Sequence, residues 1–250
     1  MFETPILVAI AATFFLAGAV KGVIGLGLPT VSLALLTVAI DLPSAMALLL
    51  VPSFVTNLWQ ALVGGHFMAA LRRIWPFLVT ATLTVWLGAL ALTRVDLSLL
   101  SALLGALLVV YSAVSLAGLR LTVSTARAAW LGPLAGAANG ILTGMTGSFV
   151  VPGILYLQAL GLTRDMLIQA MGLLFTASTI ALAVALRGND LLSLGIGAWS
   201  AAAVLPAILG MALGRRVRRG LSEQLFRRVF FAALLILGGY IIAGALGGFG

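Results

Sequence analysis

The sequence predicts an all-α fold: a polytopic α-helical membrane protein with two inverted-topology repeats of five hydrophobic segments. Three observations support this prediction. Hydrophobic residues make up 62% of the chain and charged residues only 8%, far from the composition of a soluble domain. The apolar residues form long continuous runs, which cross membranes as helices, rather than the short alternating segments of a β-barrel. A glycine-rich stretch interrupts the apolar run near the start of each half.

Ten apolar segments follow one another and fall into two sets of five. They cover 5–20, 28–40, 43–63, 74–93, 97–118, 128–143, 148–161, 165–186, 191–213 and 225–246. At 1.5 Å per residue, the first two segments of each set are too short to cross a hydrocarbon core of about 30 Å. We therefore expect each short pair to form a broken, re-entrant-like helix hairpin, followed by three full spans. Pro76 is expected in the first turn of its helix, and Pro52 and Pro206 are expected to kink theirs.

The two sets of segments predict a duplicated chain. An offset of 118 residues aligns Gly18 and Gly22 with Gly136 and Gly140. Five segments per half is an odd number, so the halves insert in opposite orientations, as in many transporters. The predicted parts are an N-terminal transmembrane repeat at 1–118, a linker at 119–127 and a C-terminal transmembrane repeat at 128–250.

The arginines predict the orientation of the chain. If each broken pair returns to the side it came from, one face receives most of the arginines, which marks the cytoplasmic side. This face receives Arg72, Arg73, Arg120, Arg127, Arg164 and the six arginines of 215–228. We therefore expect a multi-pass protein of the cell inner (plasma) membrane with both termini on the periplasmic side. The same scattered arginines explain the net charge of +8 without a nucleic-acid partner.

Several classes of chemistry are excluded by composition. The chain has no cysteine, which excludes disulfides and thiolate metal sites. His66 is the only histidine and falls in a connection between segments, so we expect no metal and no cofactor. Residues 1–5 lack the basic start of a signal peptide, and none is expected. The expected partners are a small anionic substrate and the lipid bilayer, and a homodimer is left open.

The two glycine-rich breaks are the predicted binding site. Glycine at this density weakens a helix, and opened backbone is tolerated at membrane depth only in a protein interior or beside a watery cavity. Paired breaks in two halves point to a transporter's substrate site. Helices expected to begin near Leu28-Pro29 and near Ser148 would offer an anion free N–H groups and partial positive charge. The alternative is that the glycines only let helices pack closely.

The candidate substrate-binding residues lie at the breaks and on the polar spans that follow them. Lys21 is the only lysine; it is either a counter-charge for the anion or a side chain that snorkels to the interface. Asn139 occupies its repeat position. Asn57 and Gln60 share a helix face and either line a cavity or hydrogen-bond between helices. The full set is Lys21, Gly22, Gly25, Gly27, Pro29, Asn57, Gln60, Asn139, Gly140, Thr143, Gly144, Thr146, Gly147, Ser148 and Gln169.

This duplicated order of broken helix, proline and polar span resembles the sulfite exporter TauE/SafE family over essentially the whole chain. The residues that carry the resemblance are Gly22, Gly25, Gly27 and Pro29, with Gly140, Gly144, Gly147 and Pro152 in the second copy. The resemblance implies an inner-membrane carrier of small sulfur-containing anions, such as sulfite, sulfoacetate and other organosulfonates. Members often carry a fuller glycine run, where this chain has Gly25-Leu26-Gly27 and Thr146-Gly147-Ser148.

The acidic residues bear on the mechanism. All of them fall at segment ends or in loops, so no mid-span carboxylate offers a proton relay. A negative cell interior expels anions with about 2.3 kcal/mol per charge per 100 mV, which favours export by uniport with alternating access. A passive anion channel and a non-transport membrane assembly factor are the alternatives left open. An intramembrane hydrolase is disfavoured, because Ser148 has no base except Lys21.

Overall fold

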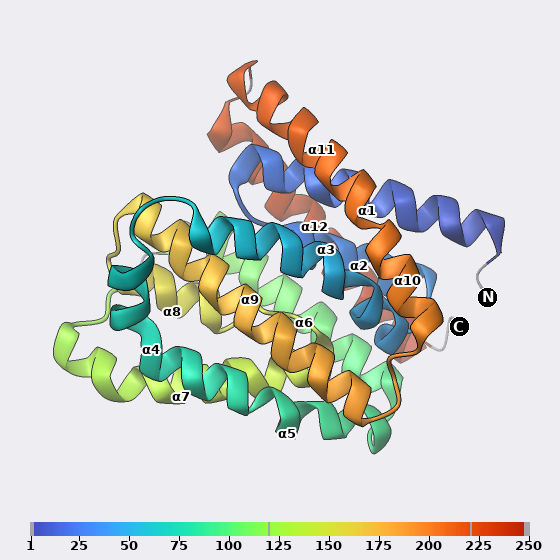
Figure 1. Cartoon of the computed structure of the whole chain (residues 1–250), viewed down its shortest axis with the longest axis horizontal. Helices are drawn as coiled ribbons and strands as arrows, with labels where there is room; N and C mark the ends of the chain where they lie inside the picture. The colour runs from blue at the N-terminus through green and yellow to red at the C-terminus, as the bar shows by residue number, and fades with distance from the viewer. Residues whose placement is uncertain (1–2, 120, 221, 248–250) are drawn as a thin grey trace. The chain divides into compact units, whose positions relative to one another are not determined.

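The computed structural model describes residues 3–119, 121–220 and 222–247 (Figure 1). Arg120 lies outside them, as do the side chains of Thr125, Arg219 and Glu223. All regular structure in the described residues is helical, which confirms the all-α prediction. The helices are α1 Thr4–Ile24, α2 Leu28–Ala39, α3 Leu42–Leu62, α4 Phe67–Leu83, α5 Val85–Ala89, the 3-10 helix η1 Leu90–Thr93, α6 Leu97–Leu116, α7 Thr125–Thr146, α8 Gly153–Ala159, α9 Arg164–Gly188, α10 Leu194–Ala202, α11 Val204–Val217, the 3-10 helix η2 Arg218–Gly220 and α12 Glu223–Gly247.

Seven helical stretches of the described residues are long and apolar enough to cross a membrane. This confirms the prediction of a polytopic membrane protein. The stretches are Thr4–Ile24, Leu42–Leu62, Phe67–Thr93, Leu97–Leu116, Arg164–Gly188, Leu194–Val217 and Gln224–Gly247.

Both predicted hairpins are broken, but the breaks are shorter than the glycine content suggested. α1 continues through Lys21 and Gly22 to Ile24 and has 21 residues, long enough to span a membrane alone. The expectation that the first segment is too short to cross is therefore wrong. α7 likewise has 22 residues and ends at Thr146. Helix propagation past single glycines costs only about 1 kcal/mol each, which close packing of these helices offsets.

The second break, at residues 147–152, is longer than the first break, at residues 25–27. α2 begins at Leu28, as predicted, but the helix expected to begin near Ser148 begins at Gly153 instead. Residues 148–150 have no regular secondary structure and a turn at 151–152 precedes the helix. Ser148 therefore lies inside the break rather than at a helix N-terminus.

The chain forms two compact units. Unit 1 comprises 1–52, 95–119 and 191–250, and unit 2 comprises 53–94 and 120–190. Each unit takes segments from both predicted repeats. Compactness does not test a duplication, so the repeat boundaries at 1–118 and 128–250 stay a prediction. Each unit is described by itself below.

In unit 1, α1 and α11 lie side by side and run in the same direction (Figure 1). Gly18 lies against Ala207, and Gly22 lies against Met211 and Gly214. A Cβ atom on either α1 glycine would collide with a carbonyl oxygen of α11. The close approach of these helices therefore depends on the missing side chains.

A second pair of unit 1, α6 and α12, runs antiparallel. Gly105 of α6 lies against Gly238 and Ile242 of α12, while the ring of Tyr111 packs edge-on against the ring of Phe231 at 5.2 Å between centroids. The C-terminal end of α6 therefore lies beside the N-terminal end of α12.

In unit 2, α7 runs parallel to α4 and α5 through the same kind of contact. Gly140 lies against Ala81, and Gly144 lies against Val85. A Cβ atom on either glycine would meet the carbonyl oxygen of its partner. The helix that opens each hairpin is thus held by a row of glycines, and for these residues the packing interpretation is correct.

The helix ends give the two hairpins a register one turn away from the predicted one. Gly25 and Gly147 end α1 and α7 in the left-handed conformation, with φ of 80° and 73°. Each donates its N–H four residues back, to the carbonyl oxygens of Lys21 and Thr143 respectively. Counted from these helix ends, Lys21 takes the place of Thr143, whereas the offset of 118 residues matches it with Asn139; the repeat match stays a prediction.

Prolines affect two further helices, and at one of them a side chain replaces the missing backbone hydrogen-bond donor. Pro52 lies inside α3 and leaves the Leu48 carbonyl without its helical donor. The Ser200 hydroxyl donates to that carbonyl at 2.8 Å. α10 ends at Ala202, four residues before Pro206, as a proline interruption predicts. The expectation for Pro76 is wrong, because α4 begins at Phe67 and Pro76 is interior.

Gly140→Val should destabilise the protein by roughly 1–3 kcal/mol, because the new side chain overpacks the α7–α4 contact. Gly239→Val is the matched control, since Gly239 is a helical glycine of α12 with nothing within 4 Å of an added Cβ. Thermal unfolding of the detergent-purified protein measures both. Equal melting temperatures for the two variants would contradict the packing role.

Candidate functional site

The α7–α8 break is a hairpin that three side chains hold together. Asn139 of α7 accepts the N–H of Gly153, the first residue of α8, through Oδ1 at 2.9 Å. The Thr143 hydroxyl donates to the Ser148 carbonyl oxygen at 3.0 Å. The Thr146 hydroxyl accepts the Ser148 N–H at 3.2 Å. Polar groups that leave the helical ladder are thus satisfied by side chains of the helix before the break, as low-dielectric surroundings require.

Two donors of the same break remain available to a ligand. The Asn139 Nδ2 and Ser148 Oγ atoms are buried, and neither has a hydrogen-bond partner among the residues that the structure describes. A buried unpaired amide or hydroxyl costs roughly 1–3 kcal/mol, so such groups in a protein interior call for a ligand or a water molecule. An anion accepts from both.

The α1–α2 break is tighter and contains two positive-φ glycines. Gly25 ends α1, and Gly27, with φ of 108°, precedes α2. The first turn of a helix has N–H groups without intrahelical acceptors, but Pro29 removes one of them. Thr30 and Leu28, which carry the others, are buried. The break therefore offers fewer backbone donors than a helix start without proline.

This first break lies toward one end of unit 1. Gly27 lies against Phe230 of α12, which is about 10 Å along that helix from its first residue at 1.5 Å per residue. Gly22, one turn earlier, lies against the backbone of Arg215 near the end of α11. The break thus lies within about one turn of Arg228 on α12 and of Arg215 on α11.

Lys21 is enclosed by protein. Only 5% of its surface is exposed, although a side chain that snorkels to an interface keeps its charged head in water. The structure therefore favours the interpretation of Lys21 as an interior cation over the snorkelling alternative. The last turn of α1, where Lys21 lies, is also the helix end that stabilises positive charge.

The polar residues of α3 and α9 divide into two kinds. Asn57 is fully buried. Gln60 donates through Nε2 to the Ile168 carbonyl oxygen at 2.9 Å, and Gln169 donates through Nε2 to the Ala61 carbonyl oxygen at 2.9 Å. Gln169 also accepts the N–H of His66. The two glutamines tie α3 and its following loop to α9, so we leave both out of the proposed substrate site.

The glycine candidates also divide into two kinds. Gly22, Gly140 and Gly144 are helical and pack against a neighbouring helix, whereas Gly25, Gly27 and Gly147 form the breaks. Two further buried groups of unit 2 lie outside the candidate set. The Ser53 and Ser178 hydroxyls have no hydrogen-bond partner within the part of the chain that the structure describes. The spacing of the sequence could have indicated Ser53, because it lies four residues before Asn57 on the same face of α3.

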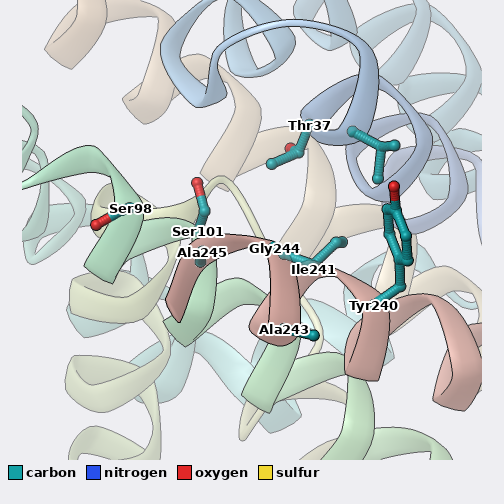
Figure 2. Close-up of a pocket in the computed structure, with 9 residues that line it drawn as sticks. Thr37, Ser98, Ser101, Tyr240, Ile241, Ala243, Gly244 and Ala245 are labelled. Carbon is teal, nitrogen blue, oxygen red and sulfur yellow. The ribbon is translucent and has the colours of Figure 1, made fainter. Parts of the chain in front are cut away.

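A separate pocket of about 530 Å³ lies in unit 1 between α2, α6 and α12. Figure 2 shows Thr37 from α2, Ser101 from α6 and Tyr240 from α12 among its lining residues. None of the lining residues is charged, and none belongs to the candidate set. At the nearby start of α6, the Ser98 N–H donates to the Asp96 carboxylate at 2.8 Å and lowers the pKa of that group. The pocket gives an anion hydroxyl groups but no counter-charge.

Within the described residues, seven membrane-length helical stretches and two broken hairpins with buried polar groups define a polytopic α-helical membrane protein. Residues 10–241 match the family described as Sulfite exporter TauE/SafE. The chain belongs to this family, and the expected resemblance is confirmed. No curated protein and no solved structure matches the chain.

Thr143→Val should lower stability by roughly 1–3 kcal/mol, because it leaves the buried Ser148 carbonyl without a donor. Thr176→Val is the matched control, since the Thr176 hydroxyl donates only to the Gly172 carbonyl of its own helix. Thermal unfolding compares the two variants, and hydrogen exchange at 147–150 should accelerate only in Thr143→Val. Unchanged exchange in that segment would refute the bracing role of Thr143.

Proposed function

We propose that the protein is an inner-membrane carrier that exports small sulfur-containing oxyanions, with sulfite as the first candidate, by alternating access. The single observation that carries this proposal is the α7–α8 break with its two buried donors, Asn139 Nδ2 and Ser148 Oγ. The family description supports the substrate class.

Neutral donors suit a transported anion. Hydrogen bonds to a charged acceptor contribute about 1.5–3 kcal/mol each, enough to replace part of the lost hydration. Because these donors are neutral, they bind the anion more weakly than an ion pair would. The proposed site includes Asn139, Thr143, Thr146, Gly147 and Ser148.

The α1–α2 break of unit 1 is a second element of the proposal, taken by itself. Gly27 and the first turn of α2 carry backbone N–H groups, Lys21 supplies a positive charge within protein, and Gly25 contributes by ending α1. An ionisable side chain inside a span is a functional-site hypothesis by default. The role proposed for Lys21 is to attract the anion, and the role proposed for the neutral donors of the α7–α8 break is to select its geometry. Asn57, buried on α3, remains a further candidate.

Orientation and direction belong to the same proposal. Both termini lie on the periplasmic side, because the arginines then gather on the cytoplasmic face. The membrane potential drives anions outward, so export needs no coupled ion. A homodimer is compatible with this proposal and is not required by it.

Ser148→Ala should lower sulfite transport about 10-fold or more, the effect expected from removing one hydrogen bond to a charged group. Ser112→Ala is the matched control: it also removes a buried hydroxyl without a partner among the described residues, but from α6, which contains no break. Sulfite efflux from proteoliposomes, normalised to inserted protein, measures both. Equal rates for the two variants would remove Ser148 from the site.

Lys21→Met should abolish anion transport while the protein remains folded and inserted, because the buried positive charge is lost. Lys21→Arg, which retains the charge, should restore part of the rate. The same efflux assay, with thermal unfolding as the folding control, makes the comparison. Full transport by Lys21→Met would show that the cation has no part in the mechanism.

Counterflow separates a carrier from a passive anion channel. Proteoliposomes loaded with unlabelled sulfite should accumulate labelled sulfite transiently, because a carrier exchanges one bound anion for another. A channel shows neither this overshoot nor saturation. Absence of both would replace the carrier proposal with the channel alternative.

A further inference from the structure

A small polar pocket in unit 1 lies outside the proposed transport site. Its volume is about 260 Å³, and it lies where the C-terminal end of α6 meets the N-terminal end of α12. The lining residues are Ser115 and Leu116 of α6 and Gln224, Arg227, Arg228 and Phe231 of α12. We propose that this pocket binds the phosphodiester headgroup of an anionic phospholipid.

The α12 residues place two cations on one face of that helix. Gln224, Arg227, Arg228 and Phe231 follow the i, i+3, i+4, i+7 spacing that gathers side chains on a single face. The Arg227 guanidinium lies 6.0 Å from the centroid of the Phe231 ring, a contact that orients the side chain by cation–π attraction.

The charge of the pocket is positive. Among the side chains that the structure describes, no carboxylate lies within ion-pair distance of Arg227 or Arg228. Guanidinium groups bind phosphate oxygens through two parallel hydrogen bonds. Ser115 and Gln224 add uncharged donors at the same pocket. This donor set matches a phosphate group.

The surroundings favour a lipid over a free anion. Leu225 and Val229 of α12 are 62% and 60% exposed, and Leu116 of α6 is 40% exposed. On α12 this apolar surface begins beside the arginines and continues along the helix to Ile236. A lipid uses the arginines for its headgroup and the apolar surface for its acyl chains. A free phosphate or sulfite ion has no acyl chains that could contact the apolar surface.

The location agrees with an anionic leaflet. The pocket lies at the end of α12 that follows the exposed arginines Arg215 and Arg216 of α11. Under the predicted orientation this end faces the cytoplasm, where anionic lipids attract basic segments. The proposal does not depend on which anion the protein transports.

Native mass spectrometry of the detergent-purified full chain tests the proposal, with phosphatidylglycerol as the probe and phosphatidylcholine, a zwitterion without net charge, as the comparison. The chain should retain one phosphatidylglycerol molecule.

The double variant R227Q/R228Q should bind it about 30-fold more weakly, since each arginine near a lipid headgroup contributes roughly a factor of five. The matched control R215Q/R216Q removes the same charge at the same end of the unit and should change binding less than about threefold. Equal weakening in both pairs would mean diffuse attraction and overturn the proposal.

Two further experiments test where the lipid binds and whether the ligand is a lipid or a free anion. Ser115→Leu, which fills the pocket and keeps both arginines, should weaken phosphatidylglycerol binding; unchanged binding would place the lipid elsewhere. Inorganic phosphate and sulfite at millimolar concentration should not displace the lipid. Complete displacement by either ion would assign the pocket to a free anion and refute the lipid proposal. Melting temperatures of all variants, compared with that of the wild type, show whether each is folded.

Discussion

The structure depends on one constraint: a backbone that leaves the helix at membrane depth must find hydrogen bonds within the protein. At the α7–α8 break, Asn139 and Thr143 provide them for Gly153 and Ser148. Ser200 does the same for the carbonyl that Pro52 leaves free in α3. Because the bracing groups come from a preceding or neighbouring helix, each interruption is fixed in place by helix packing. A site at such an interruption is therefore rigid before any ligand arrives.

Glycine residues have two different roles at these breaks: some allow close helix packing, and others end the helices. The helical glycines, such as Gly22 and Gly140, bring helices together so closely that a Cβ atom would meet a carbonyl oxygen. Gly25 and Gly147 instead end the helices in a left-handed conformation. In each hairpin the packed glycines precede the break by one to two turns, which anchors the helix just before it opens. The transport proposal depends on this order, since donors at the break are useful only if their geometry is held.

The sequence allowed much of the fold to be predicted, because apolar runs and glycine clusters report directly on spans and breaks. The sequence did not predict the features that tertiary contacts determine, such as where α1 and α7 end. α1 and α7 continue through their glycines because a neighbouring helix packs against them, and a single sequence does not reveal that partner. The glycine offset matches Lys21 with Asn139, whereas the helix ends place it at the level of Thr143, a difference that only the position of the breaks reveals. At the candidate site, residue type predicted the polar groups of Asn139 and Ser148, but not that Gln60 and Gln169 hydrogen-bond between α3 and α9.

The central claim is that the broken hairpins hold the transported anion. Hydrogen-exchange mass spectrometry of the purified protein, with and without saturating sulfite, tests it most directly, because bound oxygens protect the amides and neighbouring backbone that they contact. Exchange should slow at 25–31 and at 147–154, and remain unchanged in the 63–66 and 190–193 loops. Protection confined to other segments, or none at a sulfite concentration that saturates transport, would contradict the account.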